Sequence, residues 1–195
     1  IQSIQTTDII NVKNLGFKIK LLAISEIKSN KLIERVHPCL IKSNSDIAKI
    51  SGVLNVIIVD GHPIGRSVLQ GQGAGPGATS SALISDLCSI LRGNVKYPFG
   101  VSSYLRKKIN KFDILKHKSA SYIRIEVKDL PGVLSTVTKT FAANKISIQN
   151  LVQVPNKKKK RASIAIITHV SDERKFKKLI FTLKKNRFVI KNPNF

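Results

Sequence analysis

The first hydrophobic pattern along the chain is typical of a β-hairpin. Residues 17–28 alternate apolar and polar positions, as a half-buried strand does. Ser-Asn at residues 29–30 predicts a turn, and apolar positions between residues 32 and 41 predict a second, antiparallel strand. A short helix is expected before this hairpin at residues 6–16, and one helical turn after it at residues 45–50. The chain therefore begins as a mixture of strands and short helices.

A second hairpin leads into a glycine-rich loop. Residues 53–59 are almost continuously apolar and β-branched, which predicts a well-buried strand. Asp-Gly at residues 60–61 predicts the hairpin turn, and the chain returns through residues 64–69. Residues 70–86 then read QGQGAGPGATSSALISD, and their apolar pattern predicts a helix over residues 79–92 that ends at a glycine.

This glycine-rich loop is a candidate site for a phosphate or another negatively polarised group. Glycine permits a positive φ and a close approach of the backbone to a ligand. A helix N-terminus adds unpaired N–H groups and a partial positive charge. A tight turn before a capped helix would explain the same residues without a ligand. The usual dinucleotide fingerprint also needs a parallel βαβ unit and an acidic residue about 20 residues later. Both are missing from this pattern.

From residue 121 the pattern changes to a compact βαββαβ order. Strands are predicted at residues 122–127, 146–152 and 162–169, with a closing strand at 188–190. The motif DLPGVL at residues 129–134 predicts a turn into the first helix, whose apolar positions fall on one face. Ser171 is expected to cap the second helix, which runs to about Lys185. The charged run at residues 157–161 predicts a hairpin tip.

A shift in composition separates these two parts. Residues 94–119 contain Pro98, Gly100 and a basic stretch with a helical pattern at residues 104–112, but few core positions. We therefore predict a linker over residues 94–119.

Composition adds one rival interpretation. The 195 residues include 34 Lys and Arg against 11 Asp and Glu, and the net charge of +23 is compatible with nucleic-acid binding. The basic residues are scattered and few aromatics accompany them, so we expect no nucleic-acid partner. No apolar run approaches the roughly 18 residues of a membrane span, and no cysteine–histidine spacing suggests a metal site. Cys39 and Cys88 lie in apolar patterns typical of free thiols in a reducing compartment, which favours the cytoplasm.

The motifs, taken together, resemble one enzyme family. In order they are LGFKIKLLA at residues 15–23, RVHP at 35–38, GVLNV at 52–56, the glycine-rich loop, Thr79 and Asp86. This order and spacing resemble the C-terminal half of homoserine dehydrogenase. DLPGVL within a βαββαβ pattern resembles the regulatory ACT domain that many bacterial members carry. The resemblance covers nearly the whole chain.

The resemblance implies a fold and an activity. It implies an α+β chain in which residues 1–93 form part of the catalytic and substrate domain, with a mixed or antiparallel sheet and helices. Residues 120–195 would form a βαββαβ ACT domain. The family interconverts aspartate 4-semialdehyde and homoserine with NAD or NADP, in threonine, methionine and isoleucine biosynthesis. Its Rossmann half and its catalytic Lys and Asp lie upstream of the matched segment. No catalytic residue is therefore expected in this chain, and the chain alone is expected to be an inactive part of an oxidoreductase.

Two sets of binding residues follow from the resemblance. Gly73, Gly75 and Thr79 match the positions that approach the nicotinamide cofactor. Many bacterial members have proline directly before that threonine, where this chain has Ala78. In related ACT domains a free amino acid binds at a dimer interface, against the PGVL backbone and the start of the second strand. The matching effector-binding positions in this chain are Asp129, Gly132, Val133, Ser147 and Ile148.

The partners expected from the resemblance are the two substrates, threonine as the effector, and further copies of the chain. A homodimer or a higher homo-oligomer is expected, because both parts belong to folds that pair across a two-fold axis. A membrane partner is not expected. The sequence leaves one alternative from another class, a stand-alone module that senses an amino acid without catalysis.

Overall fold

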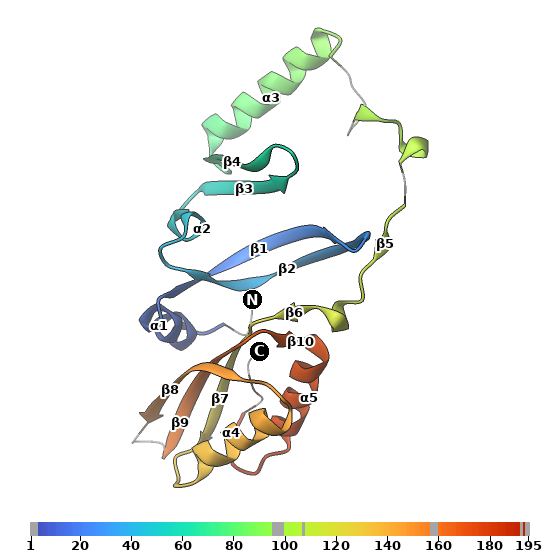
Figure 1. Cartoon of the computed structure of the whole chain (residues 1–195). Helices are drawn as coiled ribbons and strands as arrows, with labels where there is room; N and C mark the ends of the chain where they lie inside the picture. The colour runs from blue at the N-terminus through green and yellow to red at the C-terminus, as the bar shows by residue number, and fades with distance from the viewer. Residues whose placement is uncertain (1–3, 95–99, 107, 157–159, 192, 194–195) are drawn as a thin grey trace. The chain divides into compact units, whose positions relative to one another are not determined.

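A computed structural model describes residues 4–94, 100–106, 108–156, 160–191 and 193. Backbone contacts divide the chain into two units. The first unit joins Ile1–Leu40 to Asn110–Phe195, and the second is Ile41–Ile109 (Figure 1). The predicted α+β class is confirmed, since small sheets and helices alternate in both units. The predicted division at residues 93 and 119 stays a prediction, and residues 95–99 and 107 of the predicted linker lie outside the described residues.

The N-terminal elements of the first unit follow the sequence pattern. Helix α1 (Thr6–Asn14) precedes strands β1 (Phe17–Lys28) and β2 (Lys31–Lys42), which are neighbours in one sheet. Ser29 and Asn30 form the tight turn between the strands, and both have a positive φ, at 49° and 58°. Two consecutive turn residues with a positive φ give the turn a twist that matches the twist of the two flanking strands. The predicted first hairpin is therefore confirmed.

In its described residues, the segment that leads to the C-terminal part contains short elements. They are the 3-10 turns η2 (Ser103–Leu105) and η3 (Ile114–Lys116) and the strands β5 (Asn110–Lys111) and β6 (Lys118–Ser119). Strand β5 pairs in parallel with the start of β2, and Phe112 N–H donates to the Leu32 carbonyl at 2.9 Å. The predicted basic helical stretch at residues 104–112 is wrong for the described residues. Its first residues form the 3-10 turn η2, and its last residues pair with β2 instead of continuing a helix.

Residues 121–190 form a two-layer α/β sandwich, which we call the C-terminal sandwich. Its sheet has the order β7-β9-β8 and is antiparallel throughout, from strands β7 (Tyr122–Lys128), β8 (Ile148–Asn156) and β9 (Arg161–Thr168). Helices α4 (Val133–Ala143) and α5 (Glu173–Lys184) pack together against one face of this sheet (Figure 1). The predicted order of elements is confirmed. The first part of the predicted hairpin tip, residues 157–159, lies outside the described residues.

Some boundaries in the C-terminal sandwich differ from the prediction. The second strand begins at Ile148, because Ile146 turns into the core before the strand pairs. Asp172 occupies the N-cap of α5, while Ser171 belongs to the two-residue strand β10 (Ser171–Asp172), which pairs with β6. The closing strand is reduced to a bridge between Val127 and Val189 and a hydrogen bond from Ile190 N–H to the Glu126 carbonyl at 2.8 Å.

The hydrophobic core of the first unit lies between this sheet and its two helices. Alternate residues of β7 point into it, and Phe141 of α4 and Phe176 of α5 are fully buried there. The buried residues of this core come from the sheet, the helices and, for Ile146, the connection between α4 and β8: Ile123, Ile125, Val127, Val133, Val137, Phe141, Ile146, Ala162, Ile164, Ile166, Phe176, Leu179 and Leu183. A period of two in the strands and of about 3.6 in the helices places the strand and helix side chains among them on the inner faces.

The described part of the second unit contains helix α2 (Asp46–Lys49), strands β3 (Leu54–Gly61) and β4 (Gly65–Gln72), helix α3 (Pro76–Leu91) and the 3-10 turn η2. The predicted second hairpin forms with an unbroken antiparallel register from Leu54–Gln72 to Gly61–Gly65. Its turn lies at residues 62–64, beyond the predicted position. The prediction of a well-buried strand is wrong, because Ile57 is 64% exposed in a sheet of two strands.

Candidate functional site

The glycine-rich loop and helix α3 meet at Gly75. This residue is the N-cap of α3 and has φ 113° and ψ 154°, a conformation that essentially only glycine adopts. A Cβ at Gly75 would meet nothing within 4 Å, so the backbone conformation is what requires glycine. Pro76 takes the first helical position, where its fixed φ suits the helix and its missing N–H leaves no bond unmade. The loop therefore exposes backbone at the start of a helix.

Thr79 lies one turn inside the helix, which corrects the prediction that the helix begins there. Its N–H donates to the Gly75 carbonyl at 3.1 Å, and its hydroxyl donates to the same oxygen at 2.9 Å. The Ser80 hydroxyl likewise donates to the Pro76 carbonyl, at 2.8 Å. Since Pro76 has no N–H and the Thr79 N–H is already bonded, the donors left at this helix start are those of Gly77 and Ala78.

Gly73 is constrained in a different way from Gly75. Its N–H donates to the Val53 carbonyl at 2.8 Å, which continues the β3–β4 ladder by one bond. A Cβ at Gly73 would lie 1.7 Å from the side-chain nitrogen of Asn55, so a larger residue would displace that amide. Gly73, Gly75 and Thr79 thus lie together at one strand–loop–helix junction. Their assignment to a cofactor remains a prediction.

The five predicted effector residues do not lie together within one chain. Gly132 is the N-cap of α4 with φ 82°, and Val133 is buried with its N–H bonded to the Leu130 carbonyl at 3.3 Å. Ser147 and Ile148 follow the other end of α4, after 11 helical residues, which span about 16 Å at 1.5 Å per residue. A single site containing both groups therefore requires residues from two chains, as an interface site does.

A buried ion pair that the sequence did not suggest connects α1 to β7. Asp8 is 1% exposed, and its carboxylate Oδ1 accepts from Arg124 Nε at 2.6 Å and from the Tyr122 hydroxyl at 2.7 Å. Its other oxygen accepts from the Gln5 N–H at 2.8 Å, at the start of α1. Arg124 also donates to Glu126 at 3.2 Å. One carboxylate thus connects the N-terminal helix to the sheet of the C-terminal sandwich.

This network changes the chemistry of Tyr122. Burial, and then the hydrogen bond to Asp8, raise the pKa of the Tyr122 phenol far above its ordinary value of 10.0. The phenol therefore stays a hydrogen-bond donor at every physiological pH. The signal in the sequence was weak: Tyr122, Arg124 and Glu126 alternate with core residues, which indicates one polar face but not which element covers it.

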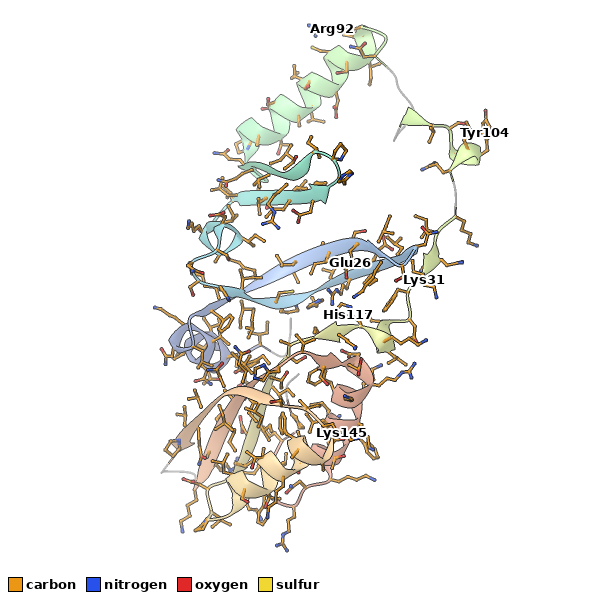
Figure 2. All side chains as sticks on the ribbon, viewed as in Figure 1. Glu26, Lys31, Arg92, Tyr104, His117 and Lys145 are labelled. Atoms are coloured by element: carbon orange, nitrogen blue, oxygen red, sulfur yellow. The ribbon has the colours of Figure 1, made fainter. Side chains whose placement is uncertain are left out.

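A second polar contact lies beside strand β2. Arg35 Nη1 contacts Nε2 of His117, and Arg35 Nη2 lies 3.9 Å from Glu26; Glu26 and His117 are labelled in Figure 2. Burial first, and then the Arg35 charge, lower the pKa of His117 below its ordinary value of 6.5. His37 of the RVHP motif lies 3.4 Å from Cys39 Sγ and 3.0 Å from the Pro38 carbonyl, so local contacts of β2 account for it.

The two halves of the sequence match two family models. Residues 1–88 match the homoserine dehydrogenase model. Residues 1–88 belong to the homoserine dehydrogenase family. Residues 121–188 match the ACT domain model, so the C-terminal sandwich is an ACT domain. The chain corresponds to the C-terminal half of homoserine dehydrogenases. Among the described residues, no helix is both long and apolar enough to cross a membrane.

Individual relatives agree with both matches. Homoserine dehydrogenase of Helicobacter pylori is 31% identical over 193 residues, which cover 99% of this chain and 45% of that protein. Homoserine dehydrogenase of Mycobacterium bovis is 32% identical over 170 residues, which cover 82% and 38%. The crystal structure of a homoserine dehydrogenase from Thiobacillus denitrificans superposes with a TM-score of 0.84 at 28% identity, over all of this chain and 45% of that one. The chain spans less than half the length of these relatives.

Proposed function

We propose that this chain is the C-terminal part of an NAD(P)-dependent homoserine dehydrogenase, which interconverts aspartate 4-semialdehyde and homoserine. The observation that carries the proposal is the order of two family matches in one chain, residues 1–88 followed by residues 121–188. Homoserine dehydrogenases from several bacteria align across both parts. A stand-alone sensing module would have no need of the first part.

The chain's contribution to cofactor binding is assigned to the loop at Gly73, Gly75 and Thr79. Exposed backbone before α3 suits an approach by the nicotinamide end of the cofactor. Gly77→Val tests this, because a Cβ at Gly77 meets nothing within 4 Å and its φ is not positive. In an active homoserine dehydrogenase that contains this segment, Gly77→Val should weaken cofactor affinity, while Gly71→Val, equally free of contacts in β4, should not. Equal affinity in both variants would show that the loop is only a turn.

Catalysis itself is assigned to residues outside this chain. The family's catalytic Lys and Asp and its Rossmann half lie upstream of the matched segment, as the resemblance implies. The purified 195-residue chain should therefore show no NAD- or NADP-linked oxidation of homoserine. Measurable turnover by this chain would contradict the assignment, whichever of the two cofactors supports it.

The ACT domain is assigned to feedback control by threonine at an interface between two copies. Supporting this, Asp129, Gly132 and Val133 lie at one end of α4, and Ser147 and Ile148 follow the other end. Calorimetry of the chain with threonine, alongside isoleucine, methionine and serine, tests the assignment. Ser147→Val at an exposed position should abolish the binding of threonine, whereas Gln153→Val at an exposed position of β8 should preserve it. Absence of binding by all four amino acids would refute the regulatory role.

Self-association is part of the proposal and is supported by the exposed apolar surface of the second unit. Leu83, Ile84, Leu87, Ile90 and Leu91 of α3 are between 53% and 78% exposed. Contiguous apolar surface of this kind marks interaction sites. Sedimentation equilibrium should give a mass above the 21.5 kDa of one chain. Leu87→Asp should reduce that mass, and Ser85→Asp on the same helix should not; a monomeric wild-type chain would contradict the proposal.

A further inference from the structure

One surface pocket of the C-terminal sandwich is unusually rich in cations. It is lined by Lys128, Leu130, Lys160, Arg161 and Ile190, and its volume of about 360 Å³ is open to solvent. We call it the basic pocket. Three of its five residues carry a positive charge, and the other two offer apolar side chains. None of them belongs to the predicted cofactor or effector sets.

Three chain segments that are hydrogen-bonded to one another build the basic pocket. Lys128 N–H donates to the Phe188 carbonyl at 3.0 Å, which ties the end of β7 to the C-terminal segment. Asp129 N–H donates to the carbonyl of Lys160, the residue before β9, at 3.1 Å, which ties the same strand end to the beginning of that strand. The lining residues therefore come from a fixed framework.

The positive charges of the basic pocket have no acidic partners in the described part of the chain. Among the described residues, none of the salt bridges within 4 Å includes Lys128, Lys160 or Arg161. The nearby acid Glu126 is already paired with Arg124 at 3.2 Å and with Lys191 at 3.7 Å. Asp129, between Lys128 and Leu130, adds one acid beside the pocket but forms no ion pair within 4 Å with its three cations, so an anion that entered would still meet a net positive charge.

We propose that the basic pocket binds a small organic phosphate through Lys128, Lys160 and Arg161. A phosphate monoester carries close to two negative charges, which three cations can offset, whereas one carboxylate would leave most of the cationic charge uncompensated. Lys supplies point charges for phosphate, and the planar fork of Arg binds two of its oxygens. Leu130 and Ile190 give the organic portion an apolar surface to pack against. Since Lys128 and Leu130 flank Asp129, a bound phosphate would also hold the turn that leads to Gly132.

Calorimetry of the full 195-residue chain at physiological salt tests this proposal, with phenyl phosphate and inorganic phosphate as probes. Phenyl phosphate should bind saturably with one site per chain, and more tightly than inorganic phosphate. K160Q/R161Q should weaken this binding by at least about tenfold, which corresponds to the loss of a charge-assisted hydrogen bond. K177Q/K178Q on the exposed face of α5 makes the same change of charge and should leave the affinity unchanged.

Three results would overturn the proposal. Equal weakening in K160Q/R161Q and K177Q/K178Q would show that a diffuse field, and not the pocket, attracts the anion. Absence of saturable binding of phenyl phosphate at millimolar concentration would show that there is no site. A short DNA duplex that competes more strongly than phenyl phosphate and depends on Lys160 and Arg161 would assign the surface to nucleic acid. Both double variants alter exposed side chains only, so their circular dichroism should match that of the wild type.

Discussion

The ACT domain and the β3–β4–α3 segment both carry apolar patterns, yet only one of them buries its apolar residues. Phe141 of α4 is 0% exposed, while Leu91 of α3 is 78% exposed. In the ACT domain three strands present one face to two helices, and both layers are closed against each other. In the other segment a two-stranded ribbon and a helix leave their apolar side chains in solvent. Apolar periodicity thus determines the type of element and which of its faces is apolar. Burial of that face needs a second layer of secondary structure to cover it.

The difference predicts where stability resides in this chain. Burial of apolar surface is the main favourable term in folding, so the ACT domain should supply most of the free energy of unfolding. The exposed segment should contribute little until another surface covers it. Each of the following substitutions compares one position in or beside the ACT domain with a matched position in the second unit.

The largest contrast is expected from truncating an apolar side chain in each region. Phe141→Ala leaves a cavity in the ACT core and should lower the free energy of unfolding by ~3–5 kcal/mol. Leu87→Ala in α3 should change it by less than ~0.5 kcal/mol, because that side chain is already in solvent. Urea unfolding followed by circular dichroism gives both values. Similar losses in the two variants would contradict the contrast.

Two aspartates offer the next contrast. Asp8→Asn removes the buried partner of Arg124 and leaves it only the more exposed Glu126, and should cost ~3 kcal/mol. Asp46→Asn removes an exposed pair with Lys49 and should cost less than ~0.5 kcal/mol. A double-mutant cycle with Arg124→Met should recover much of the first loss if the ion pair is its cause. Additive losses in that cycle would mean that Asp8 acts mainly through α1.

Two glycines with positive φ should differ as well. Gly132 has φ 82° at the start of α4, and an alanine there should cost ~1–2 kcal/mol because its Cβ is strained in this conformation. Gly75 has φ 113°, yet Gly75→Ala should leave the main unfolding transition unmoved, since the strain falls in the segment that buries little. Thermal unfolding followed at the ACT helices measures both. An equal shift of the melting temperature would show that the two regions unfold as one.

The smallest effect concerns pH. Burial and Arg35 lower the pKa of His117, so the unfolded chain binds a proton more readily than the folded chain. The contribution of neutral His117 to stability is therefore fully present above pH 6.5 and is lost as the pH falls through the lower pKa of the folded state. In a plot of the free energy of unfolding against pH, His117→Gln should flatten the slope below pH 6.5. His62→Gln in the exposed β3–β4 turn should preserve that slope. An unchanged slope in His117→Gln would contradict this.

Sequence reasoning predicted elements well and their surroundings poorly. The Ser29–Asn30 turn, the DLPGVL turn and both ACT helices follow from local propensity, which a single sequence contains. A buried strand was predicted at residues 53–59 because a continuous run of β-branched residues is usually buried. The pattern holds no information on whether another layer covers the strand. The same limit hid the Asp8–Arg124 pair, since two residues that are 116 positions apart meet only through the tertiary fold.

The candidate sites were limited in a similar way. The position of the glycine-rich loop before a helix was predictable from its residues, whereas the start of the helix at Pro76 was not, because a proline and two flanking glycines are more typical of a loop than of a first helical turn. The effector residues were found through the DLPGVL motif. Their separation by the length of α4 appears only in the structure, and a single site that contained both groups would need a second chain.

Hydrogen exchange of the 195-residue chain, measured by mass spectrometry, tests the contrast between the two regions most directly. Amides of β7, α4, β9 and α5 should exchange at least about a thousandfold more slowly than those of β3, β4 and α3, because the first group opens only with the ACT core. The measurement is made at low protein concentration, where self-association is minimal. Comparable protection in the two groups would show that the exposed apolar segment shares the stability of the ACT domain, which would contradict the contrast between the two regions.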